Sequence, residues 1–233
     1  MIGIENESGL HRALKNMYAG AGGDTEVETG GFVCDCVNGS GDIIEIQTGS
    51  FAPLRGKLLQ LCADRRVTIV YPVIEEKRIA LYSGDGTLLR VRKSPKKCRK
   101  WDLFNALVYA PELPLLPNLS VEIAIVEALE ERKADGKGSW RRGGVSITDR
   151  LLRERKRSIP LRQMEDYLQF VPFNPEEPFT AASLAAKAGI TENLARKTIY
   201  VLQRINLVEQ TGKSGRSKLF QIKTNGKRLK SKR

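Results

Sequence analysis

The sequence lacks the residues on which many hydrolases and metalloproteins depend. Its 233 residues include one histidine, His11, and four cysteines, none of them in a Cys-x-x-Cys pair. A structural zinc site needs about four Cys or His ligands at characteristic spacings, so none is expected. The cysteines are expected to be reduced and buried. His11 lies on an apolar helix stripe, where a buried, hydrogen-bonded histidine is a commoner role than a catalytic base.

Long apolar runs and nucleotide-binding loops are also missing. No run approaches the ~18 apolar residues of a membrane span, and the first residues do not have the pattern of a secretory signal. We therefore expect a cytoplasmic protein without membrane contact. Neither a G-x-G-x-x-G loop nor a Walker loop is present, so ATP or NAD chemistry is not indicated and no nucleotide cofactor is expected.

Charge is plentiful and unevenly distributed. Residues 1–50 contain eight acidic and two basic residues, a balance of −6. Because the whole chain carries +12, the remainder carries +18. A positive body suits a polyanion such as DNA, whose condensed counterions are released on binding. Metal binding would explain an acidic N-terminal segment in such a protein.

Hydrophobic periodicity predicts an α/β protein with helices packed on a sheet. Helices are expected over 4–18, 51–63, 101–109 and 180–188 and from 191 onward, and strands over 31–37, 42–48, 67–73, 78–82, 206–210 and 218–223. Residues 93–100 form a basic loop. Residues 119–133 and 140–152 fit an extended pair, but the first of these segments also fits a helix, and the sequence leaves the choice open.

The two strands at 31–37 and 42–48 predict an acidic pair. The sequence Asn38-Gly-Ser-Gly41 between them is a strong hairpin signal, and the resulting register places Asp35 directly opposite Glu45. Opposed carboxylates repel unless a cation lies between them, and their hard oxygens suit Mg²⁺ or Mn²⁺. Glu7, on the inward stripe of the first helix, can reach the same place. The alternative is that Asp35 and Glu45 are solvated on an exposed face and Glu7 only begins a helix.

This arrangement resembles the PD-(D/E)xK nucleases, with Glu7 on the first helix, Asp35 on one strand and Glu45-Ile46-Gln47 on the next. The resemblance covers about the first hundred residues and implies a restriction-endonuclease-like mixed sheet flanked by helices. It further implies that Asp35, Glu45 and the Ile46 carbonyl ligate the metal. Glu7 would hold a second metal or a metal-bound water. The implied reaction is hydrolysis of a DNA phosphodiester.

Gln47 departs from the family pattern, which has a lysine at this position. Glutamine can orient a water but supplies no positive charge. Lys57 or Arg55, on the following helix, is a candidate for the missing cation. Both also fit ordinary phosphate contacts or a solvated helix face.

The C-terminal part resembles a winged helix-turn-helix, in the order helix, helix, basic hairpin. In such domains the second helix enters the major groove and the wing contacts the backbone or the minor groove. The residues expected to contact DNA are Thr191, Asn193, Arg196, Lys197, Tyr200, Lys213, Arg216 and Lys218. Trp140 with Arg141 and Arg142, continued by basic residues at 153–157, is a second basic region, which fits either a nucleic-acid surface or a solvated face.

The predicted organisation is a nuclease-like domain over 1–157, with its core at about 1–110 and a basic extension, a winged helix over 158–224, and a disordered basic tail over 225–233. The predicted function is Mg²⁺- or Mn²⁺-dependent DNA hydrolysis, with DNA delivered by the winged helix. Two alternatives stay open, a catalytically silent DNA-binding regulator on the nuclease fold and a winged-helix adaptor that binds protein. Oligomeric state is also open, with a homodimer among the alternatives.

Overall fold

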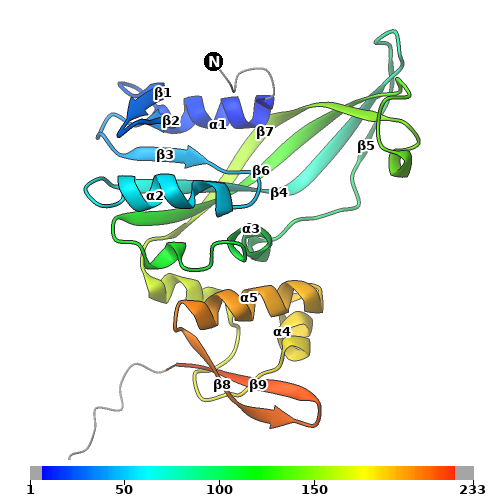
Figure 1. The fold of residues 1–233 in the computed structure, drawn as a ribbon. Helices are drawn as coiled ribbons and strands as arrows, with labels where there is room; N and C mark the ends of the chain where they lie inside the picture. The colour runs from blue at the N-terminus through cyan, green and yellow to red at the C-terminus, as the bar shows by residue number, and fades with distance from the viewer. Residues whose placement is uncertain (1–6, 224–233) are drawn as a thin grey trace, which may run out of the picture.

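One large mixed sheet with helices on both faces forms the body of the protein, shown by a computed structural model that describes residues 7–223 (Figure 1). Its strands are β1 (Asp24–Thr29), β2 (Phe32–Val37), β3 (Ile43–Ile46), β4 (Val67–Tyr82), β5 (Leu88–Lys93), β6 (Leu119–Lys133) and β7 (Ser146–Leu161). Their spatial order is β1-β2-β3-β4-β6-β7. β5 pairs with the end of β4 that β3 does not reach. The pairs β3–β4 and β4–β6 are parallel and the other pairs are antiparallel.

Helices cover the two faces of this sheet unequally. The helices of the body are α1 (Gly9–Ala19), α2 (Arg55–Leu61) and α3 (Leu103–Leu107), with short 3-10 turns η1 (Ala52–Leu54), η2 (Lys100–Asp102), η3 (Leu113–Leu115) and η4 (Trp140–Arg142). α1 packs Leu10 and Leu14 into one core cluster with residues of β2, β3, β4 and β6. α2 and α3 belong to the larger core cluster on the other face. Residues 4–6 of the expected first helix, like the expected tail, lie outside the described residues.

Three long strands extend the sheet beyond its helices. The expected strands 67–73 and 78–82 are one strand, β4, with a bulge between Ile74 and Glu76 in its ladder with β6. Residues 119–133 are extended as β6, which decides the choice that the sequence left open. The outer halves of β4, β6 and β7, together with β5 and the connecting loops (76–93 and 127–155), project past the helices in Figure 1. We call this projection the arm.

The C-terminal part has the predicted order of elements. It contains α4 (Ala181–Ala188), α5 (Glu192–Arg204) and a hairpin of β8 (Val208–Ser214) and β9 (Ser217–Ile222), joined to the sheet through η5 (Met164–Phe170). β7 runs through the predicted boundary at 157/158 and ends only at Leu161. The larger core cluster continues from α3 into α4 and α5, so this unit packs directly on the body.

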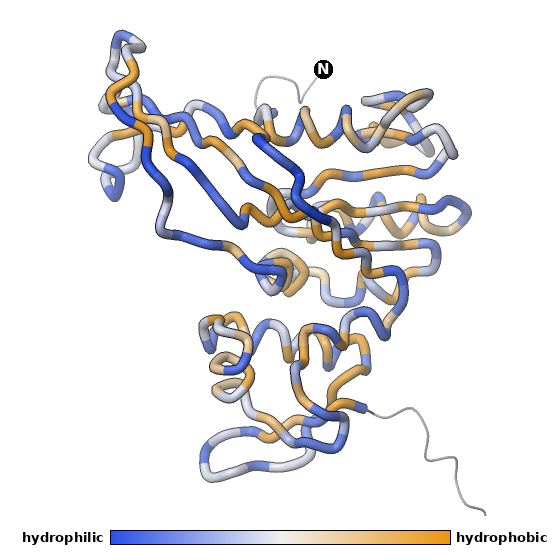
Figure 2. Tube along the Cα trace, turned by 180° about the vertical axis from the view of Figure 1, so that it is seen from behind, coloured by the Kyte–Doolittle hydropathy of each residue, from blue (hydrophilic) through white to orange (hydrophobic). Residues whose placement is uncertain are grey.

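Apolar residues are concentrated in the central strands and the helices packed on them, and polar residues interrupt the arm and the terminal hairpin (Figure 2). Among the described residues, no helix combines the length and the apolar character that a membrane crossing requires.

Candidate functional site

The hairpin formed by β2 and β3 carries the acidic pair in the predicted register. Asn38 shapes the turn, because its side-chain oxygen accepts the backbone N–H groups of Ser40 and Asp42, each at 3.0 Å. Cys36 pairs with Ile44 and Val37 with Ile43. The same register, continued by one residue, places Asp35 opposite Glu45.

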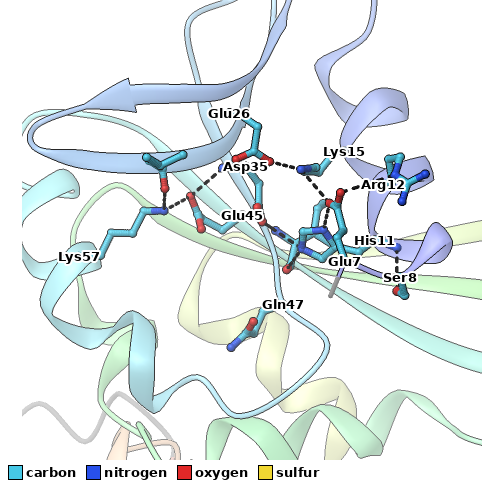
Figure 3. Close-up of polar contacts among 12 residues, drawn as sticks. Glu7, Ser8, His11, Arg12, Lys15, Glu26, Asp35, Glu45, Gln47 and Lys57 are labelled. Carbon is cyan, nitrogen blue, oxygen red and sulfur yellow. Dashed lines mark hydrogen bonds and ion pairs between the residues drawn. The ribbon is translucent and has the colours of Figure 1, made fainter. Parts of the chain in front are cut away.

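Side chains replace backbone pairing at that position. The Asp35 carboxylate accepts the Ile46 N–H at 2.7 Å, and the Asp35 N–H donates to the Glu45 carboxylate at 3.3 Å. Each carboxylate thus accepts an N–H of the opposite strand, and each also contacts a cation from a different helix (Figure 3).

Glu45 is almost fully buried and contacts Lys57 of α2. Glu45 is 4% exposed, and its Oε1 lies 2.5 Å from the Lys57 ammonium. That ammonium also donates to the Val33 carbonyl at 2.6 Å. Burial raises the pKa of Glu45, and the hydrogen bond and charge of Lys57 oppose this rise. Lys57, and not Arg55, therefore supplies the cation at this carboxylate, since Arg55 pairs with Glu112.

His11 connects α1 to both strands. Its Nε2 lies 2.8 Å from the Ile46 carbonyl and 3.3 Å from Asp35 Oδ2, and its Nδ1 lies 2.6 Å from Glu7 Oε1. A carbonyl and a carboxylate only accept hydrogen bonds, so both ring nitrogens carry a proton and the ring is an imidazolium. Burial lowers the pKa of His11, but hydrogen bonds to Asp35 and Glu7 outweigh it and raise the pKa to about 9. The sequence indicated a satisfied histidine but not this bridging position.

Glu7 lies just before α1 among basic side chains. Its carboxylate is 2.7 Å from the Lys15 ammonium and 3.7 Å from Arg12 Nε. Lys15 is buried and also contacts Glu26 of β1. Burial raises the pKa of Glu7, but Lys15 and His11 together bring it below its usual value. Sequence reasoning missed Lys15 and Glu26, although the spacing of Glu7, His11 and Lys15 along one helix face was a usable signal.

The oxygen atoms of this site are of the type that binds a hard cation, but the carboxylates point toward different basic partners and do not converge on one point. Two carboxylates and the Ile46 carbonyl are oxygen ligands of the kind that Mg²⁺ prefers. Within residues 7–223, however, no group of three His, Cys, Asp or Glu side chains is arranged to hold a metal. The physical reason is that Asp35 faces His11, Glu45 faces Lys57 and Glu7 faces Lys15.

Gln47 lies next to this network but makes no contact within it in Figure 3. Its side-chain amide donates to the Ser50 carbonyl, and its backbone N–H donates to the Val70 carbonyl at 2.9 Å. Gln47 therefore holds the loop that follows β3. Its role as a water-orienting group in place of the motif lysine stays a prediction.

Four of the eight residues predicted to contact DNA line one groove, and the other four lie outside it. A groove of about 400 Å³ lies between α5 and β9 and brings together Arg196, Tyr200, Arg216 and Lys218. Thr191 caps α5 by accepting the Leu194 N–H at 3.3 Å, and Asn193 and Lys213 are exposed. Lys197 lies on the side that packs on α3, where its ammonium donates to the Asn105 side chain at 2.7 Å. Lys197 therefore makes a contact within the protein and does not line the groove.

Comparison with known proteins gives a family over most of this structure. Residues 8–162 match the family described as "Domain of unknown function (DUF8091)". A protein of Treponema pallidum (strain Nichols), described as "Uncharacterized protein", is 31% identical over 220 residues, covering 94% of this chain and 87% of its own length. No solved structure matches. The family match runs from the N-cap of α1 to the residue after β7, and thus includes the acidic hairpin and the arm.

Proposed function

We propose that this chain, which belongs to the DUF8091 family, is a metal-dependent nuclease that hydrolyses DNA phosphodiester bonds at the Asp35–Glu45 hairpin. The observation that carries the proposal is the contact between Lys57 and buried Glu45 at 2.5 Å, beside Asp35. A PD-(D/E)xK site needs an acidic pair and a cation. The motif position holds Gln47, and α2 supplies the cation instead. The order α1, hairpin, α2, parallel β4 also agrees with the resemblance.

Asp35, Glu45 and the Ile46 carbonyl are the groups that would hold Mg²⁺ or Mn²⁺. When bound, such an ion lowers the pKa of a water and supplies positive charge next to the scissile phosphate. Lys57 opposes the rise in the pKa of Glu45 that burial causes, and it adds a fixed positive charge on the α2 side of the hairpin. His11 orients the Asp35 carboxylate and the Ile46 carbonyl.

The groove between α5 and β9 supports delivery of DNA by the C-terminal unit. Arg196 and Tyr200 on the helix and Arg216 and Lys218 on the hairpin line one concave surface. In a winged helix these two elements contact the groove and the backbone of the same duplex. Arg196 is partly neutralised by Glu192 at 2.6 Å, so we expect Arg216 and Lys218 to carry more of the phosphate attraction.

A second candidate function is favoured by His11 itself. Its imidazolium already neutralises Asp35 and occupies the Ile46 carbonyl, the same two groups that would hold the ion. A chain that keeps this arrangement in every state is a DNA-binding regulator on a silent nuclease fold. The two functions differ in cleavage and agree in salt-sensitive DNA binding.

The test is nicking of supercoiled plasmid by the full chain with Mg²⁺ or Mn²⁺. Asp35→Asn, Glu45→Gln and Lys57→Met are each expected to lower the rate by about 100-fold or more, the effect of removing one charge-stabilising group from an active site. Asp42→Asn is the matched control, because Asp42 lies on the same hairpin and pairs with Arg66 outside the network. It should nick at the wild-type rate.

Each of the following outcomes contradicts the proposal of a nuclease site at this hairpin. An inactive wild type that still binds DNA in a salt-sensitive manner identifies the silent regulator. A chain that neither cuts nor binds DNA favours the alternative of a winged-helix adaptor that binds protein. Wild-type activity in Asp35→Asn would place any observed cleavage at a different site.

A further inference from the structure

A hollow on the arm collects arginines from strands that are far apart in the sequence. It has a volume of about 290 Å³, and Arg90, Arg92, Arg132, Arg141 and Arg142 line it. No acidic residue is among its lining residues. The first two come from β5, the third from β6 and the last two from η4 in the β6–β7 loop.

Strand register explains how the hollow is built. Its floor is apolar, because Ile79 and Leu81 of β4 lie between the neighbouring strands. On one side Arg92 is opposite Ile79 and Arg90 is opposite Leu81. On the other side Arg132 is opposite Leu81. Arginines therefore rise on both sides of a short apolar strip.

Four of the five arginines lack the carboxylate partners that neutralise other basic residues of the arm. Arg132 is paired with buried Glu130 at 2.5 Å. Among the residues that the structure describes, Arg90, Arg92, Arg141 and Arg142 make no ion pair with a carboxylate. Like charges held together without a counter-charge raise the local positive potential, which is the condition for attracting an anion.

The loop that contributes Arg141 and Arg142 is closed and preformed. The Gly138 N–H donates to the Gly144 carbonyl at 2.8 Å. A Cβ on Gly138 would lie 1.9 Å from the Val145 carbonyl oxygen, so only glycine allows this closure. Arg142 is further fixed by its bond to the Val145 carbonyl at 3.1 Å. The closed loop thus holds these arginines toward the hollow, although their like charges repel one another.

An exposed aromatic ring lies beside them. Trp140 is 83% exposed, the highest value among the large exposed hydrophobic side chains of the described residues, and the Arg141 guanidinium lies 5.6 Å from its ring centre. Proteins that bind single-stranded nucleic acids combine cationic side chains, which contact the phosphates, with exposed aromatic rings, on which unpaired bases stack. Trp140 and the unpaired arginines provide this combination. A duplex keeps its bases stacked on one another and gives such a ring no partner.

We propose that the arm binds a single-stranded segment of DNA, with phosphates in the arginine hollow and one base stacked on Trp140. This inference rests on the proposed function only in taking DNA as the nucleic acid. It narrows the substrate to DNA that carries an unpaired strand.

The test is binding of a fluorescent oligothymidylate of about 12 nucleotides, within the usual site size, measured by anisotropy with EDTA present at several salt concentrations. Arg90→Ala/Arg92→Ala should weaken binding and lower the log–log salt slope by about 1.4, since each phosphate contact on a single strand contributes about 0.7. Trp140→Ala should weaken binding about tenfold with little change in slope. The control Arg65→Ala/Arg66→Ala removes the same charge at exposed positions before β4 and should leave the slope nearly unchanged.

Three results would overturn the inference. The first is wild-type affinity of the β5 double variant, and the second is an equal loss in the control. The third is an equal loss of affinity for a blunt duplex, which would make the arm a general cation surface. Because EDTA removes the metal, cleavage plays no part: a chain that binds oligothymidylate through the arm but nicks nothing contradicts the nuclease and leaves the arm assignment standing.

Discussion

Metal-free protein should titrate its single histidine with a pKa of about 9, against an ordinary value of 6.5. Burial acts to lower the pKa of His11, and the hydrogen bonds to Asp35 and Glu7 more than reverse that effect. The side chain is 21% exposed, so solvent screens these interactions only in part. The prediction tests the site geometry directly, since a buried ring without the Asp35 and Glu7 contacts would have a pKa below 6.5.

The same shift predicts how stability depends on pH. A difference of about 2.5 pKa units corresponds to about 3 kcal/mol of the free energy of unfolding. Because the pKa is higher in the folded state, this contribution is fully present below pH 6.5. It declines as pH rises from 6.5 and is lost above pH 9.

Two measurements check the prediction. NMR of the imidazole C–H signals in EDTA gives the pKa without assignment ambiguity, because the chain has one histidine. Urea unfolding of wild type and His11→Gln between pH 6 and pH 9.5 gives the stability difference, which should shrink as pH rises. Glu7→Gln and Asp35→Asn should each lower the pKa. A pKa near 6.5, or a stability difference that does not change with pH, would refute the assigned contacts.

Two further predictions concern the arm. Glu130 is 0% exposed, and Lys77, Arg132 and Arg150 overcome the effect of burial and lower its pKa to about 2. Glu130→Gln should therefore destabilise the protein by about 3 kcal/mol in urea unfolding at pH 7, since it leaves three cations without their counter-charge. This loss should fade as pH falls below 4.5, and a neutral effect at pH 7 contradicts the buried pairing. Gly138→Ala should cost about 1–3 kcal/mol because its Cβ would meet the Val145 carbonyl, whereas Lys137→Ala, an exposed neighbour, should change stability by less than about 0.5 kcal/mol.

Local sequence predicted the elements with strong periodicity or strong turn signals. The Asn38–Gly41 turn and the alternation of the two strands predicted the register that places Asp35 opposite Glu45, and the structure confirms that register. Thr191 capping and the apolar spacing after it predicted α5. By contrast, β1 and β5 were missed, because β1 has a single apolar residue, Val27, and every residue of β5 is exposed, so neither strand has a buried face. β4 was divided in two because its polar middle interrupts the apolar pattern at the bulge.

The sequence by itself determined the acidic hairpin, the helix that carries Lys57, and the order of the C-terminal elements. Tertiary structure alone decided which charge faces which. His11 reaches Asp35 and Ile46 only because α1 packs across β3, and Arg90 and Arg92 meet Arg141 and Arg142 only because β5 and η4 flank the same end of the sheet. The physical reason is that register and helix caps depend on neighbouring residues, whereas the partner of a charged side chain depends on the packing of segments that lie dozens of residues apart.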